Sequence, residues 1–289
     1  MIWIIYWLIT YSIFAFMWVN MKKISRYLSP REAVSIHFFF IPFGIITFLL
    51  AFFLNSNPIS SDLPKFLSLS ILFGALVSVN MLLWFYLYKT LNLSSFFKLR
   101  YWLTIILALI IDFFFYSIFP PFLSIIWSFF FIISWFLLMG NNKDKDTWLT
   151  LKHLIAILVV TLFMIANRTI LKEITFITTN DFAWIYLTQT IVQFMVFLCG
   201  YKYLKKVSKT KEIKTNIIWY TIIIYIAVIF EFYLHRFASL FIITIVGNIK
   251  FFIFLFFDHK NWDLHLKSKQ LLWIALWIIW IIIMIFSEI

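Results

Sequence analysis

The sequence predicts an all-α integral membrane protein with ten transmembrane helices arranged as two inverted five-helix repeats. First, 64% of its 289 residues are hydrophobic and only 12% are charged, whereas soluble domains are roughly 45–50% apolar and about 25% charged. Second, almost the whole chain divides into apolar stretches of about 20 residues, the length of a membrane-spanning helix. Third, these stretches form two sets of five. Because five is odd, the second set enters the membrane with the opposite orientation.

The first repeat covers residues 1–145, and basic or turn-forming residues separate its spans. A basic loop follows the first span, the segment Asn55–Pro64 follows the second, and the pair Pro120-Pro121 precedes the fifth. The predicted spans are Ile2–Val19, Ile36–Leu54, Phe66–Tyr88, Ser95–Tyr116 and Phe122–Met139.

The second repeat covers residues 146–289 and follows the polar run Asn141–Asp146, which we interpret as the linker. The segment Leu87–Phe97 resembles Tyr233–Ile243, since each closes one span and opens the next, and this similarity supports an internal repeat. The predicted spans are Leu151–Ile170, Phe182–Tyr201, Ile217–Leu234, Phe237–Phe257 and Gln270–Phe286.

The net charge of +12 does not indicate a nucleic-acid partner. Most Lys and Arg lie in short loops beside spans, where they set orientation and contact anionic headgroups. Their excess after the odd-numbered spans predicts a multi-pass protein of the cell membrane with both termini away from the cytoplasm. The expected partners are the lipid bilayer, a small-molecule substrate and, as an open alternative, a second copy in a homodimer.

Nothing in the sequence indicates an enzyme, a cofactor or a metal site. The motifs HExxH and GxSxG are absent, and no predicted helix presents paired carboxylates for acid–base chemistry. The segment Asp258–His265 has metal-capable residues without regular ligand spacing. The single Cys199 excludes an internal disulfide and a cysteine-based metal cluster.

The closing helix carries Trp273, Trp277 and Trp280 on one stripe. Membrane helices normally pack through Gly, Ala, Ser and Thr, yet the chain has five Gly and fourteen Trp. Two interpretations stand side by side. Either many Trp occupy positions where the fold wants Gly, because UGA codons were decoded as Trp, or the protein is Trp-rich by nature. The codons of these residues decide between the two.

The last part of the chain resembles the drug/metabolite transporter superfamily of the EamA type. HRFASL at His235–Leu240 is similar to the opening of the family's ninth helix. QLLWIALWIIW at Gln270–Trp280 is similar to its closing pattern QLLGxxLxxxG, with Trp273 and Trp280 where the family has Gly. The Pro usual in the middle of the fourth and ninth helices is absent here. The resemblance implies ten helices in two five-helix repeats and a transport function.

A shorter stretch resembles the organophosphate-translocating branch of that superfamily. GNIK at Gly247–Lys250 is similar to the branch's Gly-Asn followed by Lys-Arg, with Phe251 in place of Arg. The resemblance implies that Lys98 and Lys250, on the equivalent fourth and ninth helices, hold a phosphate across a central cavity.

Charged residues inside spans are costly, so each is a hypothesis for a functional site. Lys250 is the deepest candidate, while Lys98 and Arg100 lie two residues apart on different faces, so we expect only one of them to face the pore. The neutral Asn248 and Gln193 are candidates to orient a substrate. The same class of neutral polar residues within or beside spans includes Asn80, Asn167 and Gln189.

Structural alternatives remain for these residues. Lys98 can extend to the interface, Lys250 can pair with Asp112 or Glu231, and the neutral residues can bond between helices. We expect a secondary transporter that moves a small metabolite by alternating access, with an anionic or phosphorylated solute favoured. An exporter of amino acids or amphipathic compounds is the alternative within transport, and a lipid-modifying membrane enzyme is the alternative outside it.

Overall fold

The computed structural model describes residues 2–54, 62–90, 93–119, 150–177, 182–208, 211–237 and 240–247, with isolated positions at 122–129 and 275–279. Within these ranges every regular element is a helix and there is no strand. The short helices α2 (Pro30–Ala33), η1 (Val34–Ile36), η2 (Tyr201–Tyr203) and α9 (Leu204–Ser208) turn corners between longer ones. The longer helices are α1 (Ile2–Tyr27), α3 (His37–Leu54), α4 (Leu63–Thr90), α5 (Leu93–Tyr116), α7 (Leu151–Ile177), α8 (Phe182–Gly200), α10 (Lys211–Phe237) and α11 (Leu240–Gly247).

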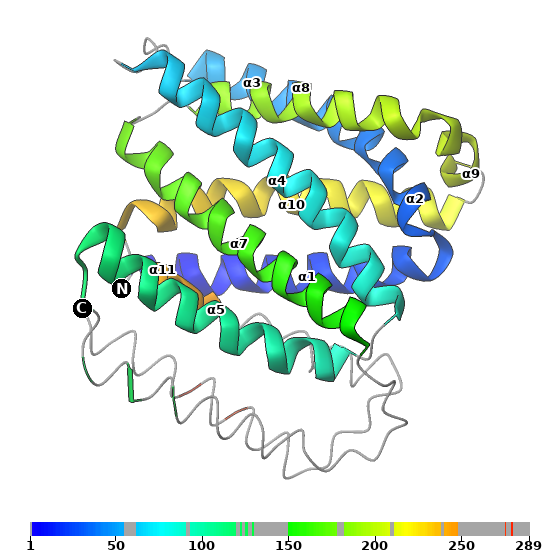
Figure 1. Ribbon diagram of the computed structural model, residues 1–289. Helices are drawn as coiled ribbons and strands as arrows, with labels where there is room; N and C mark the ends of the chain where they lie inside the picture. The colour runs from blue at the N-terminus through cyan, green and yellow to red at the C-terminus, as the bar shows by residue number, and fades with distance from the viewer. Residues whose placement is uncertain are drawn as a thin grey trace.

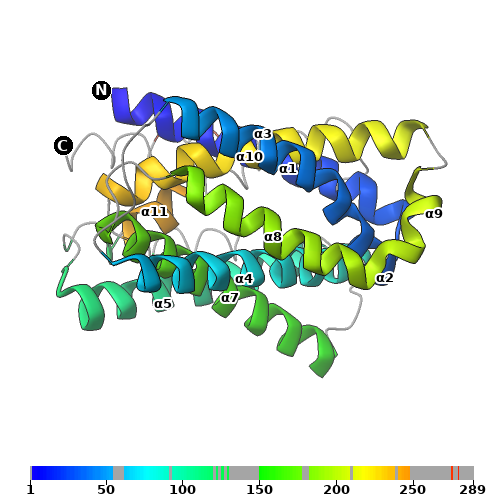
Figure 2. The same ribbon diagram turned by 90° about the horizontal axis from the view of Figure 1, so that it is seen from above.

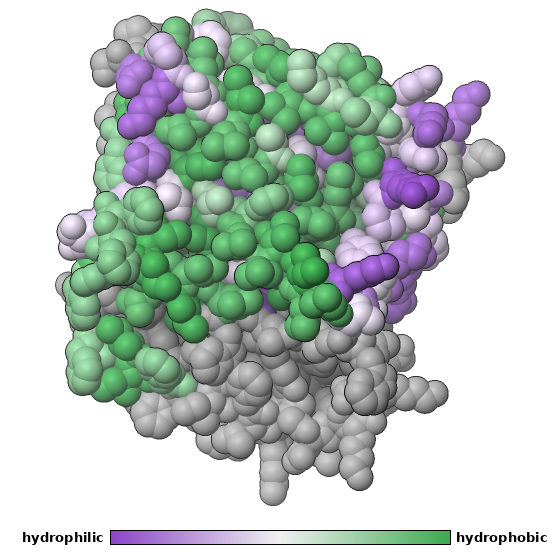
Figure 3. All heavy atoms as spheres, in the orientation of Figure 1, coloured by the Kyte–Doolittle hydropathy of each residue, from purple (hydrophilic) through white to green (hydrophobic). Residues whose placement is uncertain are grey.

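The described part of the chain is an all-α protein suited to a membrane. Its helices long and apolar enough to cross a bilayer are Pro30–Leu50, Leu63–Thr90, Leu151–Ile177 and Trp184–Tyr203. Large apolar side chains point outward along them, including Ile46, Leu50 and Phe53 on α3, as expected of a lipid-facing surface. Figure 3 shows this surface as a broad green area, with hydrophilic residues gathered mainly toward the two ends of the helices.

The helices form four main pairs, α3 with α8, α1 with α10, α4 with α7 and α5 with α11, while α4 also packs against α8 and α5 against α7. Each pair joins one helix from residues 1–145 with one from residues 146–289. Figure 2 shows the pairs α1/α10 and α4/α7 on two sides of the bundle. In Figure 1 the helices α3 and α8 lie at the top, and α5 and α11 lie below α7. The two parts of the chain are therefore interleaved around a common centre.

Two glycines lie at helix contacts and differ in the room around them. A Cβ added at Gly44 on α3 would lie 2.6 Å from the Tyr225 hydroxyl and would also collide with Thr190 on α8. A Cβ added at Gly74 on α4 would lie 3.4 Å from the Cα of Gln189, an ordinary contact distance. Gly44 is thus required by its neighbours, as small residues at membrane helix interfaces often are, whereas Gly74 leaves room for a methyl group.

A capping box begins α2 at the end of the molecule where α9 also lies. The Ser29 amide donates to a Glu32 carboxylate oxygen at 2.8 Å, and the Glu32 amide donates to the Ser29 hydroxyl at 3.4 Å. Two of the amides left unpaired at a helix start are satisfied in this way. The corner that leads from α1 into α3 is therefore specified by local sequence.

Two helices continue well past the predicted ends of their spans. The first span is predicted to end at Val19 and the sixth at Ile170, whereas α1 continues to Tyr27 and α7 to Ile177. Hydropathy falls where charged residues begin, whereas a helix continues as long as its backbone bonds are made. Basic residues beyond the predicted span ends therefore lie within helices: Lys22, Lys23, Arg26 and Lys172.

The predicted fifth and tenth spans, Phe122–Met139 and Gln270–Phe286, lie outside the described residues apart from isolated positions. The closing-helix residues Trp273, Trp277 and Trp280 also lie outside them. The other predicted spans overlap described helices, and the ninth overlaps α11 over Leu240–Gly247.

Candidate anion-binding cavity

A cavity of about 140 Å³ lies among α1, α4, α5, α7 and α10. Its polar lining consists of Asn80 on α4, Arg100 on α5, and Asn167 and Arg168 on α7, with Tyr220 on α10. Apolar and sulfur-containing side chains form the rest of the wall: Phe14, Met17, Trp18, Met21, Phe73, Val77, Met81, Trp84, Met164, Leu171 and Ile224. Two arginines therefore line a small and mostly apolar chamber.

Arg100 is 1% exposed and is held by aromatic rings. Its Cζ lies 4.2 Å from the ring centroid of Trp84 and 5.6 Å from that of Trp18. The two indoles contact each other at 5.5 Å, and Nη2 of Arg100 contacts the sulfur of Met164. Desolvated cation–π contacts contribute about 2 kcal/mol, so the rings fix the position of a charge that is costly to bury.

Arg168 is 5% exposed and approaches the cavity from α7. Its Nη1 donates a hydrogen bond of 2.7 Å to the hydroxyl of Thr244 on α11. Gly247 leaves space for the same guanidinium, because a Cβ there would lie 3.1 Å from Nη2. The hydroxyl of Tyr11 donates to the carbonyl of Ile243 at 3.0 Å and ties α1 to this part of α11.

Asn80 and Asn167 bring two amides to the same chamber. The Oδ1 atom of each is buried and accepts no hydrogen bond within the described part of the chain. Leaving a buried polar group unsatisfied costs about 1–3 kcal/mol, and sites that wait for a ligand commonly accept this cost. The two amides are therefore available to a bound molecule.

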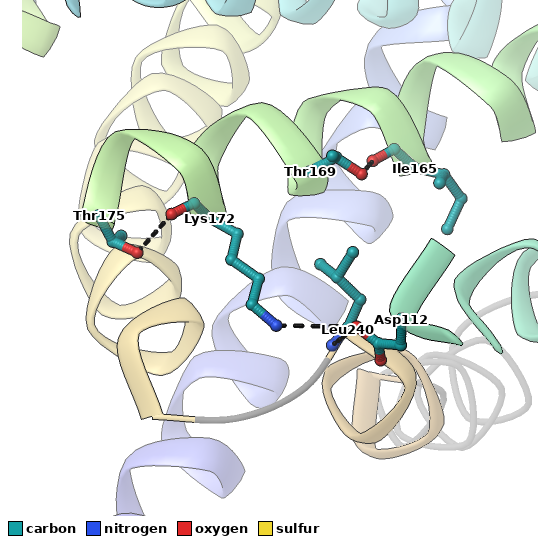
Figure 4. Close-up of polar contacts among 6 residues, drawn as sticks. All are labelled: Asp112, Ile165, Thr169, Lys172, Thr175 and Leu240. Carbon is teal, nitrogen blue, oxygen red and sulfur yellow. Dashed lines mark hydrogen bonds and ion pairs between the residues drawn. The ribbon is translucent and has the colours of Figure 1, made fainter. Parts of the chain in front are cut away.

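Figure 4 shows a buried ion pair between Lys172 on α7 and Asp112 on α5. Lys172 lies one helical turn beyond Arg168. The Nζ of Lys172 lies 3.7 Å from Oδ1 of Asp112 on α5, and both side chains are almost fully buried. The same Oδ1 accepts from the amide of Leu240, at the start of α11, at 3.2 Å. Lys172 also lies 4.3 Å from the ring centre of Tyr116. This cluster joins α5, α7 and α11 at one end of the cavity.

The predicted site residues do not all lie in this cavity. Arg100 lines the cavity, while the Lys98 side chain, Asn248 and Lys250 lie outside the described residues. Gln193 is buried elsewhere, where its Oε1 lies 3.0 Å from the hydroxyl of Tyr225 on α10. Gln193 is therefore not among the residues that line this cavity. Its bond with Tyr225 joins α8 to α10, which is the interhelical role considered as the alternative for it.

Sequence reasoning did not name Arg168, near the end of the sixth predicted span, or Lys172, just beyond that end, as site residues. Their spacing held a usable signal. Met164, Arg168 and Lys172 follow one another at intervals of four, which places them on one face of a helix. The described partner of Asp112 is Lys172, where the sequence had offered Lys250. Asn80 and Asn167, named only as members of a neutral class, both line the cavity.

Within the described ranges, no group of three His, Cys, Asp or Glu comes together to hold a metal ion. No protein-family model matches the chain, and no curated protein matches it.

Proposed function

We propose that the protein is a secondary transporter of small organic anions and that Arg100 and Arg168 hold the anion. The observation that supports this most is the chamber itself, where an arginine from each half of the chain lines one cavity among apolar helices. Guanidinium groups are donors only and match carboxylate or phosphate oxygens in pairs. In a low-dielectric chamber such groups favour an anionic ligand.

We further propose ten helices in two inverted repeats, 1–145 and 146–289, in a multi-pass protein of the cell membrane related to the EamA-type transporters. The helix contacts support this arrangement. Exchanging α1 with α7, α3 with α8, α4 with α10 and α5 with α11 converts each main pair into a pair that is also present. The contact α4/α8 likewise converts into α3/α10. An inverted repeat produces this kind of equivalence.

A short sequence match supports the same repeat. FMWVN at Phe16–Asn20 in α1 corresponds to FMIAN at Phe163–Asn167 in α7. Met17 and Met164, which occupy the same place in the two copies, both line the cavity. In the proposed mechanism the two repeats rock around this chamber and expose it to each side of the membrane in turn.

Transport assays in proteoliposomes test the proposal. The full chain is reconstituted, and uptake of labelled carboxylates and phosphate esters is compared with that of neutral solutes of the same size. We expect uptake of anions, and a loss of at least tenfold for Arg168→Met and Arg100→Met. Lys65→Met is the matched control, because Lys65 is half-exposed at the surface, near Glu173. Unchanged anion uptake by both arginine variants would contradict the proposal.

The second candidate is an exporter of amphipathic compounds, which the apolar wall of the same cavity favours. Methionines adapt to varied apolar ligands, and Met17, Met21, Met81 and Met164 all line the chamber. Including lipophilic cations and uncharged amphipathic dyes in the same assay separates the two candidates. An exporter of this kind would move those dyes and would be insensitive to Arg168→Met.

A further inference from the structure

The polar groups of the cavity are of two kinds. Arg100 and Arg168 can only donate hydrogen bonds, whereas the amides of Asn80 and Asn167 both donate and accept. Asn167 is 8% exposed. The buried Oδ1 atoms of both asparagines accept no bond within the described ranges. A ligand that satisfies the whole set must combine an anionic group with a group that offers a hydrogen.

From this set we infer that the cargo is a short organic anion that also carries a hydroxyl group, and that Asn80 and Asn167 recognise the hydroxyl. The inference rests on the proposed transport function and adds the class of substrate. A hydroxyl donates one hydrogen bond and accepts others, so it can satisfy the oxygen of one amide and the nitrogen of the other. The asparagines are then residues that determine specificity.

The positive charge of the arginines favours a ligand with a hydroxyl over one with an ammonium group. An ammonium could also donate to Oδ1, but it would lie in the same chamber as two guanidinium groups. Like charges close together in a low-dielectric site cost several kcal/mol. A neutral donor avoids this repulsion, so hydroxy acids are favoured over amino acids.

The size of the chamber limits the carbon skeleton. Its volume of about 140 Å³ is similar to that of an engineered cavity of roughly 150 Å³ that binds benzene. Drug-sized ligands occupy sites of roughly 300–1,000 Å³. A skeleton of three or four carbons fits this space.

The test uses pairs of anions that differ only in the hydroxyl. Lactate and propionate form the three-carbon pair, malate and succinate the four-carbon pair, and glycerol 3-phosphate with propyl phosphate replaces the carboxylate by a phosphate ester. Uptake by the reconstituted full chain is measured for every compound. We expect the hydroxylated member of at least one pair to be preferred about tenfold, the value of one hydrogen bond worth roughly 1.4 kcal/mol.

Variants then assign the preference to the asparagines. Asn167→Leu and Asn80→Leu should each lower the preference to about twofold or less, while uptake of the analogue that lacks the hydroxyl is retained. Asn20→Leu is the matched control. Asn20 occupies the same place in the first FMxxN sequence, but its Nδ2 donates to the carbonyl of Phe16 at 3.1 Å and it does not line the cavity. Its variant should keep the wild-type preference.

The outcomes separate the two levels of the proposal. Equal uptake of both members of every pair, or a preference that survives in both Asn80→Leu and Asn167→Leu, overturns the hydroxyl inference and leaves anion transport standing. A tenfold preference for an amino acid over the matching hydroxy acid also overturns it. Uptake of none of the anions overturns the proposed function itself. Should Asn167→Leu fail to fold, Asn80→Leu and the conservative Asn167→Ser provide the same comparison.

Discussion

The ammonium of Lys172 lies 3.7 Å from the carboxylate of Asp112, and both side chains are almost completely buried. The pair joins α7 to α5, and through the amide of Leu240 it also reaches α11. Burying two charges costs several kcal/mol per ion, and attraction and extra hydrogen bonds offset this cost only while both partners remain. The pair is therefore a sensitive point of the fold.

Lys172→Met should destabilise the protein by about 3–5 kcal/mol, because it leaves the Asp112 carboxylate buried without its cation. The double variant Lys172→Met/Asp112→Asn should recover most of that loss, since neither charge remains. Unfolding in detergent micelles measures both. The control is Lys65→Met, because the exposed pair of Lys65 and Glu173, at 4.0 Å, should contribute at most about 1 kcal/mol. Equal losses for Lys65→Met and Lys172→Met would contradict this assignment.

Trp84→Gly should lower stability by about 3–5 kcal/mol, the range for deleting a large buried aromatic side chain. It should also weaken anion uptake, because Arg100 loses the ring 4.2 Å from its Cζ. Trp219→Gly is the matched control, because Trp219 also lies inside a helix, α10, but is 55% exposed. It should lower stability by only about 1 kcal/mol, the cost of Gly inside a helix.

The Trp84→Gly variant also tests whether this Trp stands where the natural protein has Gly. A Trp84→Gly protein that is as stable as the wild type, or more so, would contradict the stability prediction. It would favour a UGA codon that the host reads as Gly. A UGG codon at Trp84 would establish that position as a genuine Trp.

Gly44→Ala should destabilise the α3/α8 contact by about 1–3 kcal/mol, the usual cost of overpacking. The added methyl carbon would lie 2.6 Å from the Tyr225 hydroxyl and would collide with Thr190. Gly74→Ala is the matched control and should be close to neutral or slightly stabilising, because its nearest neighbours lie at 3.4 Å and Ala favours a helix. Thermal unfolding of the two variants compares them directly, and a greater loss for Gly74→Ala would refute this assignment.

The end of the molecule that carries α2 and α9 should face the cytoplasm, because basic residues concentrate in the loops there. In a Cys199→Ser background, Lys205→Cys should react with a membrane-impermeant maleimide in inverted vesicles but not in intact cells. Asp62→Cys, at the other end of α4, should show the reverse. Both positions are exposed. Labelling of Lys205→Cys in intact cells would mean that the orientation is reversed.

The helical class and most of the described long helices could be predicted from the sequence, because apolar stretches of about 20 residues have few other uses. The charged residues of the site were harder to predict. Arg168 and Lys172, near and just beyond the end of the sixth predicted span, were not recognised as site residues because hydropathy records their charge and not their partners. The partners Thr244 and Asp112 lie 76 and 60 residues away along the chain, and only the fold brings them close.

The position of Arg100 in the cavity could not be predicted from its spacing in the sequence either. Its position two residues after Lys98 predicted that the two face different directions, but nothing in that spacing indicated which one faces the cavity. The decision depends on Trp84 and Trp18, whose rings receive the guanidinium. Asn80 and Asn167 were grouped with other neutral residues for a similar reason, because an amide without a partner cannot be recognised before its neighbours are placed.

The interleaving of the two halves has a consequence for biogenesis. Helices α1, α3, α4 and α5 are synthesised first, yet each has its main packing partner in the second half. The bond from Tyr11 to Ile243 spans 232 residues of chain. The early helices must therefore remain as separate helices in the bilayer until their partners are inserted. They can do so because each helix satisfies its own backbone hydrogen bonds. Assembly is limited by the completion of translation, and a chain truncated after its first half would have no partners for any of its four main helix contacts.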